Sequence, residues 1–251
     1  MSMTFLQLQR TSTSLQKSTV VHLLLPESPR LEECPQLYLL HGLSDDSSAW
    51  TRFTSLERYA RELGFAVIMP DGGTSWYNNL ACGQNYHDYI ARELPEYLEQ
   101  TFHLGRDPRR RFIAGLSMGG CGALKIGLCH PEQYAAIAAF SGAFDPQWVA
   151  EVHPALFRED FGQAPWNPQD DPFQLVRNFP RDRPKPPLYL ASGTLDHQWE
   201  IDLRMRDLAI QEGFDVTWSE NKMGHEWKQW DLEIQRAMPW MLQKMDGLRK
   251  P

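Results

Sequence analysis

One segment constrains the fold of this chain more than any other: residues 111–120 contain the pattern Gly115-x-Ser117-x-Gly119. The apolar run 112–114 before the pattern predicts a buried strand, and residues 123–128 after it continue with helical character. A strand, an abrupt turn and a helix are the context in which this pattern forms a nucleophile elbow. The glycines are needed because side chains beside the serine would collide with the strand and the helix. Ser117 is therefore the candidate nucleophile.

Composition limits the classes of protein to which the chain can belong. Its 251 residues, 42% hydrophobic and 23% charged, are typical of a soluble globular protein. A formal net charge of -7 disfavours a nucleic acid or an anionic membrane as partner, and no apolar run approaches the length of a membrane span. No secretory signal is visible, and the four cysteines lack zinc-site spacing. We expect reduced thiols, a cytoplasmic location and no metal.

Buried apolar runs alternate with helical patterns along the chain. The predicted elements are a hairpin at 4–9 and 19–25, strands at 37–40, 65–70, 112–114, 135–140, 188–192 and 215–219, and helices at 56–63, 86–102, 199–212 and 227–244. This order predicts an α/β fold with a mostly parallel central sheet, an antiparallel N-terminal hairpin and helices on both faces. We expect a single domain over residues 1–251. Residues 146–187, rich in proline, aspartate and aromatic residues, are interpreted as an excursion that forms a small cap or rim.

A serine nucleophile needs a base that takes its proton. In G-x-S-x-G enzymes of this architecture the chain order is Ser, Asp/Glu, His. His225 stands in a loop between the last predicted strand and the final helix, at the edge of the sheet that carries the site, and is the predicted base. His130 is interpreted as the C-cap of the helix after Ser117, and His153 lies in the excursion.

The acid that orients the base should follow the preceding strand. Asp196 occupies that place, and Glu200 is the second candidate. Asp202 and Asp207 are interpreted as a solvated helix face. His197, next to Asp196, is interpreted as a residue of the rim.

The oxyanion of an acyl-transfer intermediate needs two backbone N–H donors. Met118 supplies one at the start of the helix after Ser117, and Leu43 in His41-Gly42-Leu43 is the predicted second donor. Gly42 lets the backbone approach the substrate. His41 is interpreted as a brace for this loop and not as a catalytic base.

These motifs together resemble the esterase branch of the α/β-hydrolases, which includes tributyrin-type esterases, esterase D (S-formylglutathione hydrolase) and feruloyl or acetylxylan esterases. The matching segments run in order from about residue 37 to 230: Tyr38-Leu39-Leu40-His41-Gly42, Val67-Ile68-Met69-Pro70-Asp71, Trp76-Tyr77, Glu93-Leu94, Gly115-Leu116-Ser117-Met118-Gly119-Gly120, Phe140-Ser141-Gly142, Gly193-Thr194-x-Asp196 and Gly224-His225-x-Trp227. The resemblance is closest to the tributyrin-type esterases. It implies an α/β-hydrolase fold and a serine carboxylesterase with Ser117, Asp196 and His225 as catalytic residues. It also implies that Trp76 and Tyr77 contact the substrate.

The expected chemistry is hydrolysis of short-chain acyl (acetyl to butyryl) or aryl esters through an acyl-enzyme, without a cofactor. The open alternatives are an S-formylglutathione hydrolase, a feruloyl or acetylxylan-type esterase, and an acyltransferase that uses the same residues. A non-catalytic binding protein on this fold would normally have a damaged triad, whereas Ser117, Asp196 and His225 are all present. The expected partner is a small ester, and the sequence leaves open whether the protein is a homo-oligomer.

Overall fold

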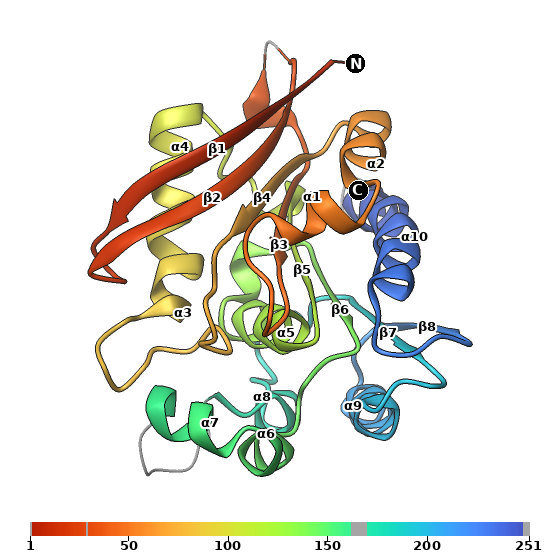
Figure 1. The fold of residues 1–251 in the computed structure, drawn as a ribbon. Coiled ribbons are helices and arrows are strands. Elements are labelled where there is room, and N and C mark those ends of the chain that lie inside the picture. Colours follow the sequence, from red (N-terminus) through yellow and green to blue (C-terminus); the bar gives the residue numbers. More distant parts are fainter. Residues whose placement is uncertain (1, 29, 162–169, 248–251) are drawn as a thin grey trace.

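A computed structural model describes residues 2–28, 30–161 and 170–247, and its centre is one eight-stranded sheet (Figure 1). The strands lie in the order β1-β2-β4-β3-β5-β6-β7-β8. Their bounds are β1 Met3–Ser12, β2 Lys17–Pro26, β3 Gln36–Leu40, β4 Ala66–Pro70, β5 Arg111–Leu116, β6 Ala136–Phe140, β7 Leu188–Gly193 and β8 Val216–Asn221. β5, which leads to Ser117, therefore lies in the interior of the sheet.

The strand directions agree with those predicted from the sequence. β1 pairs with β2 in antiparallel register, β2 with β4 likewise, and every other neighbouring pair is parallel. The predicted hairpin and the mostly parallel sheet are confirmed. The chain leaves β3 toward β4 and returns to β5 on the other side of β3. Such a reversal opens a crevice at the carboxyl ends of β3 and β5, where open α/β sheets bind ligands.

Helices cover both faces of the sheet because its strands are apolar on both sides. Leu37 and Leu39 of β3 belong to one hydrophobic cluster, and Tyr38 and Leu40 belong to the other. The helices are α1 Ala49–Phe53, α2 Leu56–Leu63, α3 Tyr86–Asp88, α4 Leu94–Phe102, α5 Met118–Cys129, α6 Pro146–Val152, α7 Pro154–Phe161, α8 Pro172–Arg177, α9 Trp199–Gln211 and α10 Trp227–Gly247. Residues of α1, α2 and α10 pack in the first cluster, and those of α4, α5, α8 and α9 in the second. Within the described residues, no helix combines the length and the apolar character needed to cross a bilayer.

The predicted helix 86–102 is built from three pieces. α3 runs into a π-helical turn, Tyr89–Glu93, and then into α4, with Pro95 in the first turn of α4. A proline is tolerated there because its missing N–H would have no helical acceptor. Glu93 fastens the hairpin to this helix: its carboxylate accepts from Ser14 N at 2.7 Å and pairs with Arg10 at 2.9 Å.

The predicted excursion, residues 146–187, contains α6, α7 and α8, which the sequence pattern did not reveal. α6 and α8 begin alike: Asp145 and Asp171 cap their N-termini with side-chain hydrogen bonds, and a proline follows each cap. In Figure 1 these three helices group beyond the end of the sheet where β5 runs into α5. Residues 162–169 of the excursion lie outside the described residues.

Candidate active site

A cavity of about 660 Å³ lies at the carboxyl ends of β3 and β5 and contains Ser117 and His225. Its wall is drawn from the loop after β3, the loop after β4, α6 and the start of α10. Its lining includes Gly42, Leu43, Asp45, Trp76, Trp148, His153, His197, Glu226, Trp227 and Trp230.

Ser117 occupies a strained turn between β5 and α5. Its backbone lies at φ 52°, ψ -119°, a conformation that L-residues rarely adopt. A Cβ on Gly115 would come within 2.3 Å of the Gly119 carbonyl oxygen, and a Cβ on Gly119 within 2.5 Å of the Leu40 carbonyl oxygen. The glycines are therefore required by backbone contact, and the predicted strand–turn–helix at the G-x-S-x-G pattern is confirmed.

The structure brings Ser117, His225 and Asp196 together from three different strand ends. His225 Nε2 lies 3.0 Å from Ser117 Oγ, and His225 Nδ1 lies 3.0 Å from both carboxylate oxygens of Asp196. With Nδ1 protonated and donating to Asp196, Nε2 presents a lone pair to the serine hydroxyl. This is the geometry of a nucleophile, its base and an orienting acid.

Asp196 is buried, yet its surroundings keep it ionised. Burial alone would raise the pKa of this carboxyl, but the hydrogen bond and the charge of His225 outweigh burial and lower the pKa below its usual value. The backbone N–H of Gln198 adds a hydrogen bond of 2.8 Å to Oδ1. A fixed negative charge beside His225 favours the imidazolium that forms when the base takes a proton.

Two polar residues that sequence reasoning missed connect the loops behind Ser117, His225 and Asp196. Gln229 of α10 is fully buried, and its amide, oriented to satisfy its neighbours, donates to the Gly224 carbonyl and accepts from Gly193 N at 2.9 Å. Ser141, which follows β6 with φ 49°, accepts from Trp230 Nε1 at 3.2 Å. These contacts join the loop of His225 to that of Asp196.

The loop after β3 approaches the nucleophile closely. A Cβ added to Gly42 would lie 3.7 Å from the Cβ of Ser117 and 2.7 Å from Leu116. Leu43 lines the cavity, and Met118 is buried at the first position of α5. The predicted oxyanion donors therefore stand on the two segments that meet at Ser117.

His41 braces this loop, as the sequence predicted. Its Nδ1 lies 2.8 Å from the Gly42 carbonyl, and its Nε2 accepts from Gly72 N at 2.8 Å. With the Nδ1 proton donated to that carbonyl, both ring nitrogens are used within the loops, so the ring cannot serve as a base.

The two aromatic residues predicted to contact the substrate lie in different places. Trp76 lines the cavity, although only 2% of its surface is exposed. Tyr77 is fully buried behind Gly72 and Gly122, its hydroxyl donates to the His41 carbonyl at 3.1 Å, and it is not among the described lining residues. The expectation for Tyr77 is therefore corrected: its hydroxyl supports the loop from below. Trp230 packs in a hydrophobic core cluster, Trp227 packs against that cluster, and both also line the cavity.

The remaining histidine and acidic residues considered from the sequence differ in how far they are buried. His130 is the C-cap of α5, as predicted. Asp207 and Glu200 are exposed, but Asp202 is buried, and its Oδ1 accepts from Gly142 N at 2.9 Å. Placing Asp202 on a solvated face was wrong because α9 packs this side of its first turn against the loop after β6. Burial raises the pKa of the Asp202 carboxyl well above its usual value.

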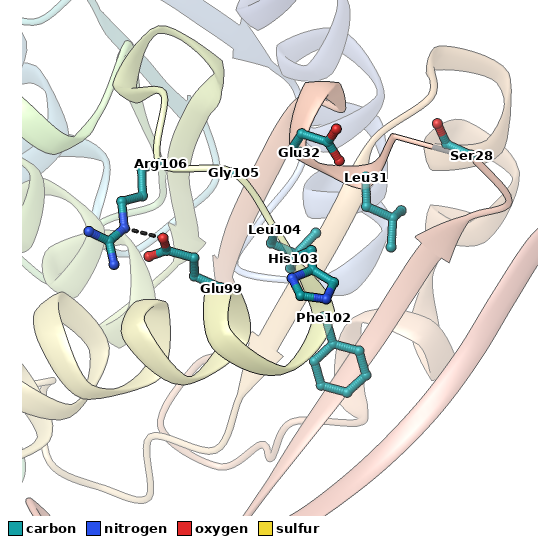
Figure 2. Close-up of a pocket in the computed structure, with 9 residues that line it drawn as sticks. All are labelled: Ser28, Leu31, Glu32, Glu99, Phe102, His103, Leu104, Gly105 and Arg106. Atoms are coloured by element: carbon teal, nitrogen blue, oxygen red, sulfur yellow. Dashed lines mark ion pairs between the residues drawn. The ribbon is translucent and has the colours of Figure 1, made fainter.

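A second cavity, of about 710 Å³, lies near the amino ends of β3 and β5 (Figure 2). Leu31, Phe102 and Leu104 supply its apolar wall, and an ion pair between Arg106 and Glu99 closes one side. Ser117 stands at the opposite, carboxyl end of β5. We therefore place the candidate active site in the first cavity.

Comparisons with known proteins find similarity to esterases and serine hydrolases. The sequence model of the family described as "Putative esterase" matches residues 12–241. The fluorophosphonate-binding serine hydrolase F of Staphylococcus aureus is 30% identical, superposes with a TM-score of 0.89 and covers 95% of this chain and 98% of its own. An S-formylglutathione hydrolase of the same organism is also 30% identical, with a TM-score of 0.85 and coverage of 96% and 99%. An acetyl esterase of Caldicellulosiruptor saccharolyticus is 26% identical over 97% of this chain and all of its own length.

Proposed function

The chain belongs to this esterase family and is a carboxylesterase of the α/β-hydrolase fold, and we propose that Ser117, His225 and Asp196 are its catalytic triad. The observation that carries the proposal is the continuous chain of contacts at 3.0 Å from Ser117 Oγ through His225 to Asp196. The three residues are far apart in the sequence, and the fold brings their side chains into contact.

The proposed mechanism is acyl transfer in two steps. Ser117 Oγ attacks the ester carbonyl carbon while His225 Nε2 takes its proton, and the backbone N–H groups of Leu43 and Met118 stabilise the oxyanion. The intermediate collapses, the alcohol leaves with the proton from His225, and an acyl group stays on Ser117. A water molecule, deprotonated by His225, then releases the acid. Asp196 holds the Nδ1 proton of His225 throughout.

The proposed substrates are neutral esters with a short acyl group, acetyl to butyryl, or with an aryl group. Bulky aromatic side chains, Trp76, Trp148, Trp227 and Trp230, line the cavity around Ser117. They narrow the space beside the nucleophile and offer flat apolar surfaces for an aryl group. We also propose that the excursion 146–187 forms a rim over the site, because Trp148 and His153 reach the cavity from it.

The acyl series of p-nitrophenyl esters, from acetate to decanoate, tests this function. We expect kcat/KM to be highest between acetate and butyrate and to fall by about tenfold or more at decanoate, because a long chain must displace the aromatic walls. A product assay with added alcohol separates hydrolysis from acyl transfer to the alcohol. Absence of hydrolysis across the series would reject the function.

An S-formylglutathione hydrolase is the second candidate, favoured by the solved structure with that activity in its name. The charge of the cavity argues against it. Asp45 and Glu226 are acidic, and the described lining residues include no lysine or arginine. Since S-formylglutathione carries a net negative charge, and the chain itself has a formal net charge of -7, the anion would enter an unfavourable potential.

Phenyl acetate and 4-carboxyphenyl acetate test this argument with the same acyl group. The kcat/KM of each ester is divided by the rate constant of its alkaline hydrolysis, which corrects for the different leaving groups. At low salt we expect this corrected kcat/KM to be about fivefold lower for 4-carboxyphenyl acetate than for phenyl acetate. The difference should shrink at higher salt, because salt screens the carboxylates. Asp45→Asn should narrow the gap. A preference for the anion, or high activity on S-formylglutathione itself, would favour the second candidate.

The four cysteines are free thiols in the structure. This supports a cytoplasmic location as part of the proposal, because a reducing compartment keeps thiols unpaired.

A further inference from the structure

His197 lies beside the proposed triad, and its imidazole has no role in the proposed mechanism. Its ring centroid lies 4.4 Å from that of His225, and its ring also stacks on Trp148, with the centroids 5.7 Å apart. Its side chain is 55% exposed, so ions in solution can reach it, whereas the carboxylate of Asp196 beside it is buried. Two imidazoles and one carboxylate therefore meet at the edge of the cavity.

The spacing of these groups is that of metal ligands. Asp196, His197 and His225 each offer one ligand atom, and the three atoms lie within 4.8 Å of one another. Asp196 Oδ1 is 3.0 Å from His225 Nδ1 and 3.7 Å from His197 Nδ1. Ligands placed tetrahedrally around Zn²⁺ at about 2.1 Å are separated by about 3.4 Å, which lies between these two distances.

We propose that Asp196, His197 and His225 form a binding site for Zn²⁺ or a similar borderline divalent cation, and that occupation of this site reversibly inhibits the esterase. The inhibition rests on the proposed function, because it requires His225 to be the base. Imidazole nitrogens select Zn²⁺ over Mg²⁺, which prefers a shell of oxygens.

The proton balance explains the inhibition. Without metal, the Nδ1 proton of His225 is donated to Asp196 and the Nε2 lone pair faces Ser117. A cation that takes the lone pair of Nδ1 leaves the single ring proton on Nε2. Nε2 then cannot accept the proton of Ser117, and the carboxylate of Asp196 is engaged by the cation as well. Hydrolysis stops although no residue of the triad is chemically changed.

Replacement of His197 tests the site, because this residue is a ligand but takes no part in the proposed mechanism. His197→Phe keeps a ring to stack on Trp148 but removes both nitrogens, and His197→Gln is the second variant should the first fold poorly. Hydrolysis of p-nitrophenyl acetate is measured against ZnCl₂ in a non-chelating buffer, each protein relative to its own rate without metal. We expect Zn²⁺ to inhibit the wild type, EDTA to restore the rate, and the half-inhibiting concentration to rise about tenfold or more in either variant. MgCl₂ should not inhibit.

Two other places could hold Zn²⁺ and serve as matched controls. His87 and His130 approach each other at 3.0 Å between their Nε2 atoms, and Cys82 is an exposed thiol. His130→Gln and Cys82→Ser should leave the inhibition unchanged. Unchanged inhibition in the His197 variants, or its loss in either control, would overturn the proposal.

Calorimetry separates failure of this proposal from failure of the proposed function. Zn²⁺ is titrated into Ser117→Ala, which retains all three ligands. We expect binding that the added His197→Phe substitution weakens about tenfold or more. Absence of binding would overturn the metal site while leaving the esterase intact. If zinc binding depends on His197 but esterase activity does not depend on His225, the metal site stands and the proposed triad is wrong. The proposed mechanism of inhibition is then overturned.

Discussion

Replacing Ser117 by alanine should lower kcat/KM for p-nitrophenyl acetate by about 10³-fold or more. The expected loss is large because the substitution removes the atom that attacks the carbonyl, and His225 then has no hydroxyl to deprotonate. Binding of the ester and the oxyanion donors remain, so a small residual rate from direct attack by water is expected. The fold should be preserved, because alanine keeps the Cβ of the serine and lacks only its hydroxyl.

Three measurements make this result specific to Ser117. Thermal unfolding should show the same midpoint for Ser117→Ala as for the wild type, and Ser28→Ala, at the second cavity, should keep full activity. A fluorophosphonate probe should attach to the wild type at Ser117, identified by mass spectrometry, and fail to attach to Ser117→Ala. Activity of Ser117→Ala within tenfold of the wild type, with the protein folded, would reject Ser117 as the nucleophile.

The elbow could be read from the sequence because its cause is local. Gly115 and Gly119 contact the backbone within a few residues of Ser117 or at the neighbouring strand end. The apolar runs predicted the strands equally well, since each strand of a covered parallel sheet must be apolar on both faces. β3 is an example. Leu37 and Leu39 pack in the hydrophobic cluster on one face of the sheet, and Tyr38 and Leu40 pack in the cluster on the other face.

The parts that could not be predicted depend on contacts between distant segments. The place of Gln229 behind the triad is set by where α10 crosses the loops after β6 and β7, which no local pattern encodes. Tyr77 and Trp76 are neighbours in sequence, but the turn after β4 sends one side chain into the core and the other to the cavity. Both have positive φ, a conformation that the residue types do not reveal.

A local sequence pattern marks the start of two helices in the excursion. Asp145-Pro146 and Asp171-Pro172 are both a capping residue followed by a proline at the first helical position. These pairs mark the starts of α6 and α8 more reliably than hydrophobic periodicity does, because such short helices contribute few residues to a buried face. His153, the C-cap residue of α6, lines the cavity.

Asp196→Asn should lower kcat by about 10³- to 10⁴-fold. The carboxylate accepts the Nδ1 proton of His225 and carries the charge that favours the imidazolium. An asparagine amide has the same shape, but it removes the charge and can turn its NH₂ group toward Nδ1. The ring would then hold its proton on Nε2 and present a donor, instead of a lone pair, to Ser117.

Asp202→Asn is the matched control for this prediction, because the chain offers two buried aspartates six residues apart with opposite electrostatics. The pKa of Asp196 is lowered by its contact with His225, whereas burial raises the pKa of Asp202 well above its usual value. An amide resembles a protonated carboxyl and can still accept from Gly142 N, so Asp202→Asn should change kcat by less than about threefold. Both variants are compared by kcat on p-nitrophenyl acetate and by thermal unfolding. Equal losses in both would mean that any change in this buried polar region disturbs the site, and a loss confined to Asp202→Asn would reject Asp196 as the acid that orients His225.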